Sequence, residues 1–154
     1  MKPSPEEARI TGLMQPGVLC RDGFLGDDPR PLGEIIDSDR GALESLGVTQ
    51  ERLAARMAEV YSAAEAATGA AVKIGQHLTA LHHEAMGLMP SPFPGEGMFR
   101  KGEVEVTDSR NGVKMVMTAL SIHMIAAHGF FQGRGLRYRA EPGLLCDMFD
   151  LARP

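Results

Sequence analysis

The feature that most constrains the fold is a β-hairpin pattern between residues 103 and 117. Valine and methionine recur in two short runs, 103–107 and 113–117, as they do in strands that bury one face. The connection between the runs ends in Asn111 and Gly112, which tolerate the positive φ of a tight turn. We therefore predict an antiparallel hairpin at the centre of a small sheet.

The clearest helix is predicted over residues 49–68. Thr49 is a favourable N-cap, apolar side chains recur after it at helical spacing, and Gly69 follows its end. A second helix is predicted over residues 119–128, and because it carries almost no charge we expect it to be buried on nearly every side. Helices packed on a hairpin predict an α+β fold.

The stretch from Val72 to Met86 fits two secondary structures, because its apolar residues match one face of a strand and equally one face of a helix. We favour a long strand over residues 72–83, since Val72 and Ile74 open it and Gly75 weakens a helix. The predicted sheet then consists of 72–83, 103–107 and 113–117. The helical alternative stays open at this stage.

The remaining elements are expected to be short. Residues 1–31 are interrupted by prolines and glycines and should be mostly loop, apart from a helix near 5–14. Residues 32–46 should form two helical turns, ended by Gly47. Later in the chain we expect a proline-rich loop without regular structure over 89–97, a short strand over 136–139, and a helix that begins near Pro142.

Length and composition fit one globular domain. A chain of 154 residues with 44% hydrophobic and 23% charged residues can bury a core without disulfides or metal. We interpret residues 1–154 as a single domain with a helical part, 32–69, and a sheet-containing part, 70–154. Cys20 and Cys146 lack a CxxC spacing, so we expect free thiols and a reducing, cytoplasmic location.

Membranes and nucleic acids are not expected partners. No apolar run approaches the roughly 20 residues that cross a bilayer, and the N-terminus has prolines and acids where a signal peptide is apolar. Residues 46–57 resemble the first helix of a repressor-type helix-turn-helix, but the helical pattern continues to Thr68 where a glycine turn should follow. The net charge of −4 also disfavours phosphate backbones.

Positive charge is concentrated in the second half of the chain. Residues 1–69 hold 7 basic and 12 acidic side chains, whereas 70–154 hold 9 and 8. The segment 128–139 combines glycines, adjacent phenylalanines and three arginines, and such a segment can enclose an anion with backbone N–H groups and guanidinium forks. Arg134 and Arg137 are therefore candidate residues for a small anionic ligand.

All five histidines lie in the second half of the chain. His82, His123 and His128 are candidate ligands for a divalent metal such as zinc, because neutral imidazole is the commonest metal ligand. No HExxH motif is present, and positions 123 and 128 are about 140° apart around a helix, so both need help to reach one ion. The alternative is buried histidines with hydrogen bonds to neighbouring groups.

Two classes of function remain. A non-catalytic binding or interaction module is favoured, because no catalytic motif has its required spacing. We expect it to form a homo-oligomer, since its methionine-rich strands and uncharged helix offer more apolar surface than a small domain buries. The alternative is a metal-dependent or histidine-based enzyme that acts on a small anionic substrate.

Overall fold

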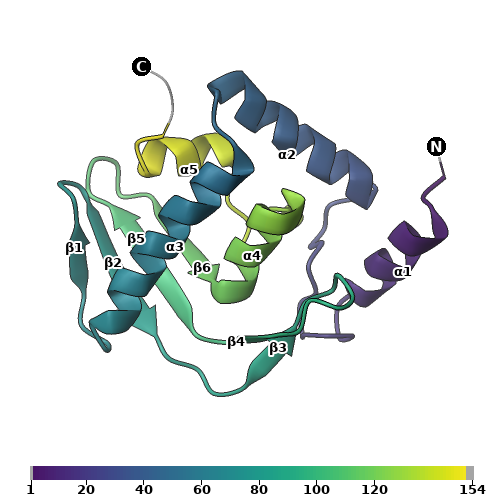
Figure 1. Ribbon diagram of the computed structural model, residues 1–154, viewed down its shortest axis with the longest axis horizontal. Helices are drawn as coiled ribbons and strands as arrows, with labels where there is room; N and C mark the ends of the chain where they lie inside the picture. The colour runs from purple at the N-terminus through teal and green to yellow at the C-terminus, as the bar shows by residue number, and fades with distance from the viewer. Residues whose placement is uncertain (1, 152–154) are drawn as a thin grey trace.

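The structure is a computed structural model that describes residues 2–151. It has an α+β fold with a four-stranded antiparallel sheet in the order β1-β2-β5-β6 and a separate two-stranded sheet, β3-β4. Helices α3 and α4 lie next to the large sheet, and α1 lies at the opposite end of the molecule from β1 (Figure 1). The elements are α1 (Pro5–Leu13), α2 (Leu32–Leu46), α3 (Gln50–Ala66), β1 (Val72–Ile74), β2 (Leu78–His83), β3 (Leu88–Pro90), β4 (Met98–Arg100), β5 (Glu103–Asp108), β6 (Lys114–Thr118), α4 (Ala119–His128) and α5 (Pro142–Met148).

The predicted hairpin is present as β5 and β6. The two strands pair in antiparallel register with Val106 opposite Met115. The turn has the expected chemistry, because Gly112 has a φ of 74° and the Asn111 Oδ1 accepts a hydrogen bond from the Val113 N–H. Strand β2 pairs with the other edge of β5, so β5 lies in the interior of the sheet and β6 forms one of its edges.

Helix α3 covers one part of the core, as its sequence predicted. The Thr49 hydroxyl accepts a hydrogen bond from the Arg52 N–H at 3.1 Å and caps the N-terminus. Met57 and Val60 are fully buried in a hydrophobic cluster that also contains Val104 and Val106 of the sheet. Burial of this apolar face against the sheet, rather than helix propensity, supplies most of the stability of such a helix.

Helix α4 separates two hydrophobic clusters, which explains its lack of charge. Ile125 packs in the cluster under α3, whereas Leu120 and Met124 pack in a second cluster with residues of α1 and α2. Thr118 and Ser121 form a reciprocal capping box at its N-terminus, and Gly129 ends it in the left-handed conformation. The predicted helix over 119–128 is confirmed, and it contributes residues to both hydrophobic clusters.

Two predictions about helices and strands need correction. Residues 32–46 form one continuous helix, because Ile35 and Leu43 anchor it in the core and Asp39 is turned inward to a partner described below. The predicted long strand over 72–83 is two antiparallel strands, β1 and β2. Gly75 adopts a φ of 61° at the start of the turn between them, so it reverses the chain where we expected only a weak point.

Two further corrections concern loops. The proline-rich segment is flanked by the short strands β3 and β4, which place Pro90 opposite Met98. The strand predicted over 136–139 is absent, and within that range Arg137 and Tyr138 form a turn. The last helix begins at Pro142 as expected, Cys20 and Cys146 are free, and no helix in residues 2–151 is long and apolar enough to cross a bilayer.

Candidate metal centre

One carboxylate and two histidines converge beside α4. Glu96 lies in the loop between β3 and β4, and its Oε1 is 3.0 Å from the Nε2 of His123. Its Oε2 is 2.7 Å from the Nε2 of His128. One donor atom from each of the three residues lies within 4.8 Å of the others, the arrangement of a metal-ligating group.

The Glu96 carboxylate bridges the two histidines, although they point in different directions from α4. His123 lies in the middle of the helix and His128 is its last residue, so their rings meet at 82° with centroids 6.4 Å apart. Glu96 enters between them from the β3-β4 loop and contacts one histidine with each oxygen. The third ligand thus comes from a distant segment.

Neighbouring side chains hold the cluster in place. The Ser91 hydroxyl donates a hydrogen bond to the Glu96 Oε1 at 2.8 Å and accepts one from the Phe93 N–H at 3.1 Å. The Phe93 ring stacks on His128 with centroids 3.7 Å apart. Carboxylate and imidazole are therefore oriented by a hydrogen bond and by packing, which is how metal ligands are commonly supported.

The Glu96 carboxylate is stabilised in its charged form. Burial raises its pKa, but the hydrogen bonds with Ser91 and His128, together with the close contact with His123, act against burial and outweigh it, so the pKa lies below the ordinary glutamate value. The side chain is 20% exposed, and each histidine side chain is 29% exposed. Glu96 consequently carries a negative charge near neutral pH, and the three side chains remain partly accessible to solvent.

The Nε2 of His123 is the one buried side-chain polar atom without a hydrogen bond in the described part of the chain. It faces the Glu96 Oε1, but the 3.0 Å contact is not aligned as a hydrogen bond, and that oxygen already accepts from Ser91. A buried nitrogen without a partner costs free energy. A metal ion is a natural partner for its lone pair.

His82, the third histidine predicted as a ligand, lies elsewhere. It is in β2, and its ring makes an edge contact with Tyr61 at a centroid distance of 5.8 Å. Glu96 takes the position that we assigned to His82. It is the only acidic residue between Glu84 and Glu103, which is the one sequence signal that could have singled it out.

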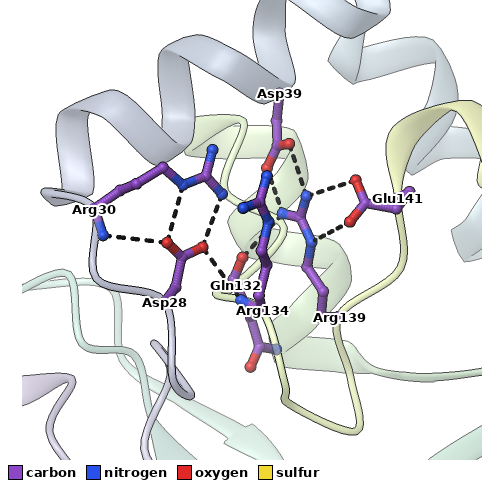
Figure 2. Close-up of polar contacts among 7 residues, drawn as sticks. All are labelled: Asp28, Arg30, Asp39, Gln132, Arg134, Arg139 and Glu141. Atoms are coloured by element: carbon purple, nitrogen blue, oxygen red, sulfur yellow. Dashed lines mark hydrogen bonds and ion pairs between the residues drawn. The ribbon is translucent and has the colours of Figure 1, made fainter.

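The arginines predicted to hold an anion do not meet in one place. Arg137 contacts Glu103 through its Nη1 at 2.6 and 2.8 Å. The Arg134 N–H donates to the Asp28 Oδ2 at 3.3 Å, and the residue is exposed. The third arginine of the segment, Arg139, reaches between Asp39 and Glu141 (Figure 2). Arg139 therefore stabilises the fold, and its guanidinium is not available to bind an anion.

Comparisons with known proteins leave the site to be interpreted from its geometry. No protein-family model matches the chain, and no curated protein or solved structure matches it. The convergence of Glu96, His123 and His128 is therefore the observation on which a function can be proposed.

Proposed function

We propose that the protein binds a divalent transition metal ion through Glu96, His123 and His128. The observation that carries this proposal is the buried Nε2 of His123, which has no hydrogen bond and lies next to a charged carboxylate and a second imidazole. Donors at about 2.1 Å around a tetrahedral zinc are about 3.4 Å apart. The observed contacts of 2.7 and 3.0 Å need only a small expansion to admit the ion.

The donor set favours zinc over calcium or magnesium. Two imidazoles and one carboxylate suit zinc and its neighbours in the first transition row, whereas calcium and magnesium prefer oxygen ligands alone. Three protein ligands also leave a coordination position free for water or an anion, as in catalytic zinc sites. The partial exposure of the three side chains gives such a ligand access.

Zinc titration of untagged, metal-free protein by calorimetry tests the proposal. We expect one equivalent to bind the wild type, and Glu96→Gln, His123→Gln or His128→Gln to weaken binding by roughly 100-fold or more, because each removes a direct ligand. His82→Gln is the matched control, since it removes a histidine outside the cluster. Equal affinity in all four variants would reject the site.

We propose self-association as a second property. Its support is an exposed apolar face of the β3-β4 sheet, where Leu88 and Met98 are 54% and 56% exposed and Met86, just before β3, is 95% exposed. Exposed apolar groups of this kind often mark an interface. Sedimentation should show a dimer that Leu88→Glu with Met98→Glu converts to monomer, and a wild type that remains monomeric at high concentration would contradict it.

A further inference from the structure

A cavity of about 450 Å³ lies between the N-terminal loop and the segment after α4. Its lining residues come from the 19–24 loop, β3, the connection from β4 to β5, the start of α4 and the 132–138 segment. None of them belongs to the metal centre, although Met89 of the lining pairs in register with Phe99, whose ring contacts His123. The volume is within the range of small-molecule sites.

One part of the cavity lining is apolar. Phe24 and Leu120 are both 3% exposed and belong to the second hydrophobic cluster, and Leu19 and Met89 pack against that cluster. Such a surface can bind a hydrocarbon or aromatic group by the hydrophobic effect.

The wall is rigid because two backbone segments are in direct contact. The Gly133 N–H donates to the Phe24 carbonyl, and the Asp27 N–H donates to the Arg134 carbonyl, both at 3.0 Å. A Cβ on Gly133 would lie 1.9 Å from the Leu25 carbonyl oxygen, so the segments have no room to approach or to accept a side chain there. The cavity is therefore preformed.

The rim is cationic. Arg21, Arg100 and Lys101 line the cavity and form no ion pair with the described residues, whereas Arg137 is paired with Glu103. The lining therefore has four basic side chains and two acidic ones, Asp22 and Glu103. Its net charge is +2, in a chain whose net charge is −4. This local excess of positive charge favours an anion.

Gln132 adds a polar group and backbone strain to the interior. The residue is 4% exposed and adopts a φ of 69°, a conformation that is costly for a residue with a side chain. Arg139 stabilises it by donating a hydrogen bond to its carbonyl at 3.0 Å (Figure 2). The side-chain amide makes no hydrogen bond with residues 2–151, so it remains free for a ligand.

We propose that this cavity binds a small amphipathic carboxylate. The apolar body lies against Phe24 and Leu120, and the carboxylate lies at the rim between Arg100 and Lys101. Both parts are required, because exposed cations alone bind a small anion weakly and the apolar interior alone does not select charge.

Octanoate is the probe that tests the proposal, added to metal-chelated protein and followed by amide chemical shifts. We expect saturable shifts at Phe24, Gln132 and Gly133, no saturation with acetate, and affinity at least about tenfold lower for octylammonium, whose charge is repelled by the rim. Equal binding of acetate or octylammonium would overturn the assignment. Chelation removes metal, so this result is independent of the metal centre.

Charge-removing variants provide the matched comparison. Arg100→Gln with Lys101→Gln should weaken octanoate binding roughly tenfold, by the loss of two rim charges. Arg9→Gln with Lys73→Gln removes the same net charge from exposed positions outside the cavity and should leave the affinity unchanged. Similar affinities for the two double variants would overturn the proposed placement of the carboxylate.

Discussion

Arg139 and Asp39 form a buried, two-point ion pair although they are 100 residues apart in the sequence. The Arg139 Nη1 lies 2.5 Å from the Asp39 Oδ2, and Nη2 lies 2.9 Å from Oδ1. The two side chains are 6% and 5% exposed. The pair attaches the segment after α4 to α2, and so fixes the 132–139 loop, part of which lines the cavity described above (Figure 2).

Breaking this pair on one side should be strongly destabilising. Arg139→Gln leaves the Asp39 carboxylate buried without its cation, and we expect the free energy of unfolding to fall by about 3 kcal/mol. Urea unfolding measures the loss. Combining Arg139→Gln with Asp39→Asn should recover part of the stability, and a double variant whose loss equals the sum of the single losses would show that the pair is not coupled.

Two glycines should respond to alanine in opposite directions. Gly133→Ala forces a Cβ onto the Leu25 carbonyl oxygen and should cost about 2 kcal/mol or more. Gly41→Ala, on the exposed face of α2 with no atom within 4 Å of its Cβ position, should stabilise by about 0.5–1 kcal/mol through helix propensity. Thermal unfolding of both variants checks the contrast, and equal effects would contradict the close backbone contact.

Asp28 should make the stability depend on pH in the acidic range. Hydrogen bonds from Arg30 lower the pKa of Asp28 far below the ordinary value of 3.8, although burial acts in the opposite direction. Because the folded pKa lies below the unfolded one, the stabilisation is complete above pH 3.8 and is lost as the pH falls through the folded pKa.

The variant Asp28→Asn measures this contribution. Wild type should be more stable than Asp28→Asn at neutral pH, and the difference should shrink as the pH falls below 3.8. Unfolding by urea at a series of pH values gives the difference directly. A gap that stays constant, or widens on acidification, would be inconsistent with a lowered pKa.

Local signals account for the part of the fold that the sequence predicted. The β5-β6 hairpin follows from its turn residues, and α3 from Thr49 and its apolar spacing. The continuity of α2 could not be predicted in this way. From the sequence alone Asp39 is expected at the surface, and its burial depends on the ion pair with Arg139, which is distant in the sequence.

The candidate site was predictable in part for the same reason. His123 and His128 share a helix, so their proximity follows from the sequence, but five residues of separation argue against a common ligand. Glu96 contacts both histidines because the β3-β4 loop packs against α4, and that packing depends on the tertiary structure. The cavity likewise has no local sequence signal, because its lining comes from segments that are distant in the sequence.

The most direct test of the central claim is a crystal structure of the zinc-soaked protein with anomalous data at the zinc edge. The account predicts one strong peak at about 2.0–2.2 Å from the Glu96 carboxylate and the Nε2 atoms of His123 and His128. A peak coordinated by other residues, or no peak between these three side chains, would contradict it.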